Sequence, residues 1–242
     1  MITNLAYFYE TSKKLRGGKW VWVKDGNGEA RNNVLLGGTI LNPKKGFDHL
    51  YAAQLVQYTP NEGCLIFRSF ALKANAAADA TTYVLNGDGY GDAPEVGMLL
   101  MVAPYALKVE TLTADTTSGA VTKTVADYTG QSAKITAVEY DATNEKFTIT
   151  LDNTLGALNA GAILVEATGT AKSATAKVLV PNPNTFIEAD RDLMPTDGYG
   201  SENANYSIST VYNKQAWIVR MQPLPEYVLA KNKSNIDGIF WI

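Results

Sequence analysis

The residues best spaced to bind a metal ion lie just after an early aromatic segment. Asp25, Asn27 and Glu29 stand two positions apart, which is the spacing of the first oxygen ligands in an EF-hand calcium loop. Such a loop also needs glycine at its sixth position and glutamate at its twelfth, where this chain has Ala30 and Leu36. The Asp-Gly and Asn-Gly pairs here are typical of a tight turn between strands. We therefore expect a turn, with no metal and no cofactor.

Side chains suited to nucleophilic or acid–base catalysis are few. His49 is the only histidine and Cys64 the only cysteine, so a metal site or a Cys–His pair has little support and an intramolecular disulfide framework is excluded. Carboxylates gather in residues 186–194, where Asp190 and Asp192 are the obvious candidates for an acid or base. No histidine or suitably placed lysine accompanies them in the sequence. We predict that the protein is not an enzyme.

Two loops share the sequence Asp-Gly-Tyr-Gly, at residues 88–91 and 197–200. Neither has the Lys-Ser/Thr ending of a P-loop or the strand-to-helix frame of a dinucleotide fingerprint. Asp and Tyr side chains in such loops can hydrogen-bond to sugars and stack on them. The candidate ligand residues are Asp88, Tyr90, Asp197 and Tyr199. The repeat is either a coincidence or a sign of equivalent loops in two related halves.

The segment between Pro104 and Pro181 differs in composition from its flanks. It contains no Pro, Trp, Met, Cys, His or Arg, and Thr and Ala dominate it. Within it, Phe147-Thr-Ile-Thr-Leu-Asp152 alternates apolar and polar residues, the pattern of a strand with one buried face. Residues 141–145 supply turn-forming side chains that would fold this strand back on residues 134–140. We predict a small Thr/Ala-rich β domain, residues 105–180, inserted into a larger host.

The host is predicted to be mostly β and sandwich-like or barrel-like. It combines residues 33–104 with residues 181–242, because apolar, β-branched runs bounded by glycine and proline recur in both. Residues 1–32 are interpreted as an N-terminal arm and a first hairpin. The first 18 residues either pack on their own domain or dock on a neighbouring subunit.

Aromatic residues crowd both ends of the chain. Trp20 and Trp22 alternate with Val21 and Val23, so this strand is buried on both sides or forms half of an interface. An apolar C-terminus also argues for contact with a core or a partner. We predict a homo-oligomer whose candidate interface residues are Tyr7, Phe8, Tyr9, Trp20, Trp22, Phe240 and Trp241.

The charge balance excludes some partners. The chain has 21 basic and 24 acidic residues, a net charge of −3, which argues against a general nucleic-acid or anionic-membrane binder. It has no run of 18 apolar residues, so no membrane span is expected. The first ten residues lack the cationic start and apolar run of a secretory signal. If the protein acts outside a cell, we expect it to leave by another route.

Three segments carry a resemblance to a known family. Val34-Leu-Leu-Gly-Gly-Thr-Ile-Leu41, Gly97-Met-Leu-Leu-Met-Val-Ala103 and Ile236-Asp-Gly-Ile-Phe-Trp-Ile242 resemble strands of tailed-bacteriophage head fibre and head decoration proteins. The likeness covers residues 33–104 and 181–242. The Thr/Ala-rich β domain also looks like an addition found in head fibre proteins of Bacteroides-type phages.

The resemblance implies a non-enzymatic auxiliary capsid protein. It would be synthesised in the bacterial host cytoplasm, released by lysis, and seated on the outer capsid surface of the virion. It implies a homotrimer whose host domain attaches to a major or auxiliary capsid protein, and assigns no catalytic residues. The alternative is a carbohydrate-binding module or adhesin of β-sandwich type, with a host-surface glycan as its ligand.

Overall fold

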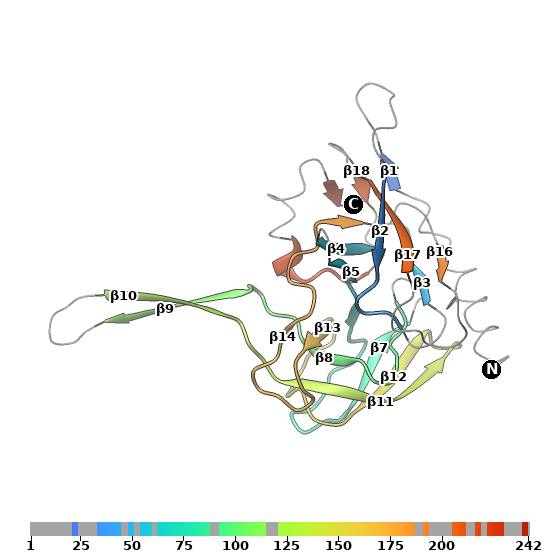
Figure 1. Cartoon of the computed structure of the whole chain (residues 1–242). Coiled ribbons are helices and arrows are strands. Elements are labelled where there is room, and N and C mark those ends of the chain that lie inside the picture. Colours follow the sequence, from blue (N-terminus) through green and yellow to red (C-terminus); the bar gives the residue numbers. More distant parts are fainter. Residues whose placement is uncertain are drawn as a thin grey trace.

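Strands dominate the part of the chain that the structure describes. The computed structural model describes residues 21–23, 33–44, 48–50, 54–59, 62–87, 92–114, 121–186, 191–193, 205–211, 216–218, 222–229 and 239–241. They form mostly antiparallel sheets, with one helical turn at residues 226–229. The predicted mostly β fold class is confirmed. Figure 1 shows two groups of strands, one above the other, and a long two-stranded arm that extends from the lower group.

The lower group is a seven-stranded sheet. Its order is β14-β13-β8-β11-β12-β7, and β6 pairs with β13 beside this path. Its strands are β6 (Ser69–Ala71), β7 (Thr82–Asn86), β8 (Leu99–Val102), β11 (Ser132–Asp141), β12 (Lys146–Leu151), β13 (Ile163–Thr168) and β14 (Lys177–Val178). Tyr83, Leu100 and Leu164 are among the buried residues of its core.

The predicted hairpin is present as β11 and β12. Its register pairs Tyr140 with Phe147 and Asp141 with Lys146. Phe147, Ile149 and Leu151 are buried, as their alternation predicts. Asp141 holds the turn because its Oδ1 accepts hydrogen bonds, each 3.0 Å long, from the amides of residues 143 and 144.

The threonines between these apolar residues are not on an open surface. Thr148 and Thr150, which the alternation places toward water, are half-buried. The reason is that β12 is an interior strand: β7 pairs with it on the side away from β11. The chain after β7 also lies close to the turn before β12, because the Gly87 amide donates a 2.9 Å hydrogen bond to the carbonyl of Glu145.

The strand pairing does not follow the predicted domain boundary at Pro104. Strands before this proline (β6, β7 and β8) share one sheet and one core with strands after it (β11, β12 and β13). Their apolar side chains, such as Tyr83 and Leu100, are covered by those of the Thr-rich segment. The composition change at Pro104 therefore falls between strands that pair in one sheet. At the other predicted boundary, Pro181, the chain does leave this sheet.

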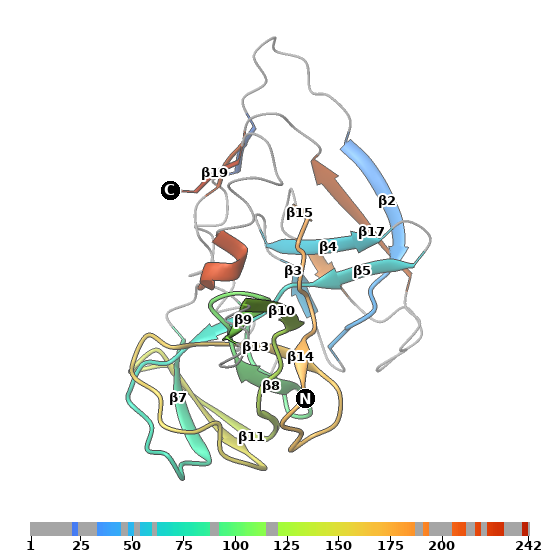
Figure 2. The same ribbon diagram turned by 90° about the vertical axis from the view of Figure 1, so that its left-hand side faces the viewer.

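The upper group joins the two ends of the chain in several small sheets (Figures 1 and 2). β15 pairs with β4 and β4 with β5, while β17 pairs with β2, β16 with β3, and β18 with both β1 and β19. The strands are β1 (Val21–Val23), β2 (Asn33–Thr39), β3 (Asp48–Leu50), β4 (Leu55–Thr59), β5 (Gly63–Ile66), β15 (Thr185–Phe186), β16 (Arg191–Leu193), β17 (Asn205–Val211), β18 (Ala216–Ile218) and β19 (Ile239–Trp241).

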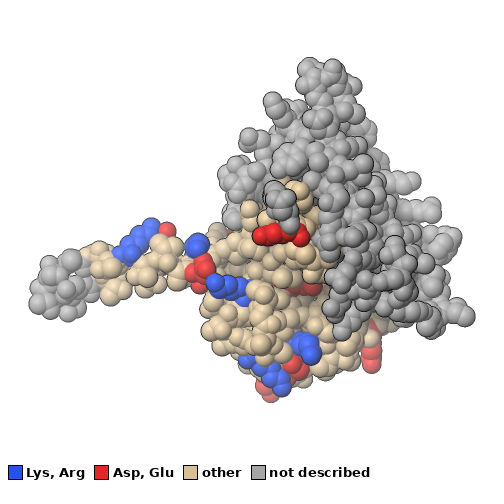
Figure 3. Space-filling model, in the orientation of Figure 1, with Lys and Arg blue, Asp and Glu red and all other residues tan. Residues whose placement is uncertain are grey.

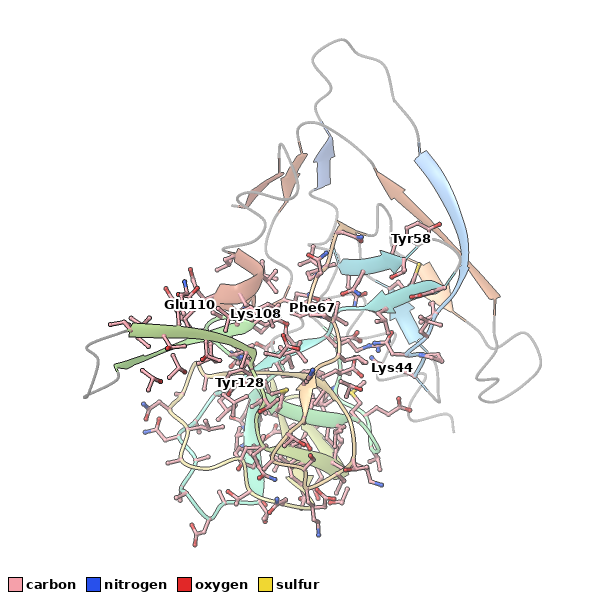
Figure 4. All side chains as sticks on the ribbon, turned by 60° about the vertical axis from the view of Figure 1, so that its left-hand side comes forward. Lys44, Tyr58, Phe67, Lys108, Glu110 and Tyr128 are labelled. Carbon is pink, nitrogen blue, oxygen red and sulfur yellow. The ribbon has the colours of Figure 1, made fainter. Side chains whose placement is uncertain are left out.

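A shared core connects the two groups. Leu55 of β4 and Phe67, which follows β5, pack with Met101 and Val165 of the lower sheet. The helical turn at 226–229 contributes Tyr227 and Val228 to the same cluster. Figure 4 shows Phe67 between the upper strands and the lower sheet.

Candidate functional site

The most prominent surface feature is the arm formed by β9 (Lys108–Ala114) and β10 (Val121–Asp127). It projects away from the body in Figure 1 and points toward the viewer in Figure 2. The two strands pair with each other from Lys108–Asp127 to Ala114–Val121, and neither pairs with another described strand. Residues 108–113 and all of β10 are exposed. The arm therefore presents two free strand edges and both of its faces to its surroundings.

Large apolar side chains lie on this arm without cover. Leu112 is 68% exposed, Val121 63% and Val125 52%. Residues opposite one another in an antiparallel pair share a face, so the register places all three on one face, which also carries the charged residues Lys108, Glu110, Lys123 and Asp127. Glu110 and Lys123 form an ion pair of 2.7 Å. The other face carries Val109, Thr111, Thr113, Thr122, Thr124 and Ala126.

The root of the arm is tied to the body. The amide of Tyr128 donates a 2.9 Å hydrogen bond to the carbonyl of Leu107, and both side chains pack against the shared core. Figure 4 shows Tyr128 at the point where the arm leaves the sheet, and the space-filling view in Figure 3 shows charges of both signs along the arm.

The charges at the root also join the arm to the lower sheet. Asp127 contacts Lys108 across the arm, and it bonds to Lys177 of β14 over 3.0 Å. Hydrogen bonds from Lys108 and Lys177 lower the pKa of Asp127 to about 2, so this carboxylate is ionised at neutral pH. Ionised Asp127 thus holds both strands of the arm and β14 together.

A second cluster of charged residues lies buried between the two strand groups. We call it the charged junction: Asn42, Lys44, Gln54, Arg68, Asp92 and Glu166. The side chain of Arg68 is fully buried, that of Asp92 is 1% exposed and that of Lys44 4%. Burying charges is costly unless they are paired and hydrogen-bonded. The position of Lys44 between the groups is visible in Figure 4.

Asp92 is the centre of the charged junction. Its Oδ1 accepts a hydrogen bond from Lys44 Nζ. Its Oδ2 accepts hydrogen bonds of 2.9 Å from both Gln54 Nε2 and Arg68 Nε. Burial raises the pKa of Asp92, but the positive charges of Lys44 and Arg68 outweigh burial and hold the pKa below its ordinary value.

Glu166 of β13 is the second carboxylate of the charged junction. Its Oε2 accepts hydrogen bonds from Asn42 Nδ2 over 2.9 Å and from Arg68 Nη1 over 3.3 Å. Burial raises the pKa of Glu166, with Arg68 opposing this shift. Lys44 follows β2, Gln54 precedes β4 and Asp92 precedes β8. The charged junction thus links these three segments to Glu166 in β13 of the lower sheet.

The sequence-predicted interface residues fall partly within the described chain. Trp22 lies in β1, and Phe240 and Trp241 lie in β19. The register sets Trp22 opposite Trp217 of β18, and Trp217 opposite Phe240, so the two ends of the chain meet in one sheet. Tyr7, Phe8, Tyr9 and Trp20 lie outside the described residues, as do Asp88, Tyr90, Asp197 and Tyr199.

The candidate catalytic residues are placed as follows. Asp192 in β16 stands opposite His49 in β3. The two residues are far apart in the sequence, so their pairing could not be predicted from it. Asp190 lies outside the described residues. Cys64 is buried, and burial raises the pKa of its thiol to about 11. Among the described residues, no group of three or more His, Cys, Asp or Glu side chains is arranged to hold a metal ion.

Neither the arm nor the charged junction follows from the sequence pattern. The arm has a weak alternation signal because threonines and charges separate its apolar residues. The junction gives no local signal because its members lie up to 124 positions apart. In the described ranges, no helix has the length and hydropathy to cross a membrane.

Comparison with known proteins identifies no relative: no family model, no curated protein and no solved structure matches this chain. The fold and the two sites define a β-rich protein with a projecting arm and a buried charged junction.

Proposed function

We propose that this chain is a non-enzymatic structural protein that assembles with other protein subunits through the β9–β10 arm. The observation that carries the proposal is the exposure of Leu112, Val121 and Val125 along a hairpin that nothing in the described chain covers. A two-stranded hairpin is at best marginally stable in water. Its free edges and exposed apolar side chains are the features that partner chains cover in assemblies.

The resemblance of the host segments to head fibre and decoration proteins suggests which assembly this is. Under this proposal the chain forms a homotrimer that decorates the outer capsid surface of a tailed phage and binds a major or auxiliary capsid protein. Apolar contact and strand pairing through the arm would make attachment only weakly sensitive to salt, unlike binding to nucleic acid. The candidate sugar-binding loops lie outside the described residues, so no observation on this structure favours the glycan-binding alternative.

The first test measures assembly of the purified chain by light scattering after gel filtration. The wild type should elute as an oligomer. Replacing Leu112 and Val121 by Glu should reduce the oligomer, because the substitutions replace the exposed apolar side chains by charges without touching the core. The matched control replaces Thr111 and Thr122 by Glu on the opposite face. A monomeric wild type at micromolar concentration contradicts the proposal, and equal loss in both variants contradicts the role of the exposed Leu112 and Val121.

The second test addresses the virion. Electron microscopy of virions labelled with antibody against this chain should show label on the outer head surface. Label confined to the tail, or no label on virions that contain the chain, would contradict the capsid role while leaving assembly through the arm intact.

A further inference from the structure

The Lys44–Asp92 pair in the charged junction has an arrangement suited to covalent chemistry. Lys44 Nζ contacts Asp92 Oδ1, and both side chains are buried. The other carboxylate oxygen, Oδ2, is held by two donors, Gln54 Nε2 and Arg68 Nε, each at 2.9 Å. The carboxyl group therefore presents one oxygen to an amine and the other to a pair of fixed N–H groups. Such a fixed contact gives a very high effective concentration of the two reacting groups.

We propose that Lys44 and Asp92 condense to an intramolecular amide bond that staples the two strand groups together. The step begins from the minor neutral form of the pair, in which one proton has moved from the Lys44 ammonium to Asp92 Oδ1, although Lys44 and Arg68 favour the ionised carboxylate. The lone pair of Nζ then forms a bond to Asp92 Cγ, and negative charge develops on Oδ2. When the carbonyl re-forms, Oδ1 leaves as one molecule of water, with the proton it already carries and a second proton from Nζ. No oxidant, reductant or co-reactant is needed.

The two donors on Oδ2 are placed where the charge develops. Hydrogen-bond donors fixed around a developing oxyanion stabilise the tetrahedral intermediate in acyl transfer. Gln54 and Arg68 fill this position because both point at the oxygen that does not contact Lys44. They touch the reacting carboxyl group and are the catalytic residues of the proposed step.

The charge balance of the junction favours the product. Before the reaction its described residues include two cations, Lys44 and Arg68, and two carboxylates, Asp92 and Glu166. The condensation removes one charge of each sign, and Arg68 keeps Glu166 as its counter-ion. A buried ion pair that has lost its hydration is thereby replaced by a neutral amide, which removes the cost of keeping two ions from water. Glu166 is a positioning residue, since its contact is to Arg68.

The arm supplies an internal comparison. Lys108 and Asp127 are also in direct contact, but their side chains are 65% and 47% exposed. Water solvates both ions there and does not allow the neutral pair to persist. We expect this pair to stay ionic.

The test is intact-mass spectrometry of the full chain after denaturation. The wild type should weigh less than its sequence mass by one water molecule, and Lys44→Met should restore the full mass expected for that variant. Lys108→Met is the matched control and should keep the loss of water. After trypsin digestion, the wild type should yield one branched peptide that contains both Lys44 and Asp92, since trypsin does not cleave after an acylated lysine.

Peptide mapping also separates the amide from another source of water loss. Asp-Gly pairs can cyclise to a succinimide with the same mass change, and they occur at residues 25–26, 88–89, 197–198 and 237–238. A wild type with the full sequence mass overturns the proposal. A loss of water that maps to an Asp-Gly pair overturns it as well. The wild-type measurement decides by itself if Lys44→Met does not fold.

Discussion

Two hairpins of this chain, β11–β12 and β9–β10, both place threonines between apolar residues but have opposite surroundings. In β12, Phe147, Ile149 and Leu151 are at most 6% exposed. In β10, Val121 and Val125 are more than half exposed, although they also alternate with polar residues. Both hairpins are antiparallel pairs, with one register shift in β11 between Ile135 and Ala137, so backbone pairing alone does not explain the difference.

The difference lies in the spacing of large apolar residues. β12 places Phe, Ile and Leu at successive positions of one face, and this continuous apolar row can pack against the core of the lower sheet. On the face of β10 that carries Val121 and Val125, Lys123 stands between the two valines, so burying that face in its own chain would also bury a charge. Alternation favours a strand in both cases. The continuity of the apolar row decides whether the strand is buried in its own chain.

The largest effect that tests this comparison is expected from Phe147→Ala. Phe147 is 6% exposed and its ring lies 4.8 Å from that of Tyr140. Truncation should cost roughly 3–5 kcal/mol of unfolding free energy, because it removes buried area and leaves a cavity. Urea denaturation measures this loss. Thr148→Ala is the control one position away and should cost less than about 1 kcal/mol. Equal losses in the two variants would show that the register of β12 is wrong.

A smaller loss is expected where β7 meets the turn between β11 and β12. A Cβ atom on Gly87 would lie 2.9 Å from the ring of Tyr140 and 3.0 Å from the backbone of Lys146. Gly87→Ala should therefore destabilise the protein by about 1–3 kcal/mol through overpacking. Asn86→Ala, at the exposed neighbouring position, should change the stability by less than about 0.5 kcal/mol. An unchanged stability for Gly87→Ala would contradict this close packing.

A pH dependence should distinguish the root of the arm from the charged junction. The folded-state pKa of Asp127, about 2, lies below the value near 3.9 expected for an unfolded aspartate. Its stabilising effect is therefore complete above about pH 4 and is lost as the pH falls toward 2. In urea unfolding, the stability advantage of wild type over Asp127→Asn should shrink across this window. An advantage that does not change with pH would show that Asp127 has no depressed pKa.

Glu166 should respond to pH with the opposite sign. Its folded-state pKa is raised, so the fold favours the protonated form, and the stability it contributes declines as the pH rises above the unfolded value near 4.3. Glu166→Gln imitates the protonated form and should gain in stability relative to wild type as the pH rises. A relative gain toward low pH would contradict the raised pKa.

Sequence reasoning recovers the parts of this fold that local pattern determines. The β11–β12 hairpin is predictable because its apolar row and its turn, from Asp141 to Glu145, are contiguous in sequence. The cover that β7 gives to β12 is not, because strand order in a sheet depends on which distant edges meet. The charged junction is unpredictable for the same reason, since Arg68 and Glu166 become neighbours only when β13 pairs with β8 and β6.

The smallest effect on folding is expected from Leu112→Ala in the arm. Leu112 is 68% exposed, so its truncation removes little buried area and should change the unfolding free energy of the monomer by less than about 0.5 kcal/mol. Self-association, measured by sedimentation, should weaken if partner subunits cover this side chain. Thr113→Ala, its neighbour on the other face, should change neither quantity. A loss of monomer stability as large as that from Phe147→Ala would mean that the arm packs against its own chain, and the contrast between the two hairpins would fail. If stability holds while association weakens, then Leu112 contributes to contacts between chains and not to the folding of one.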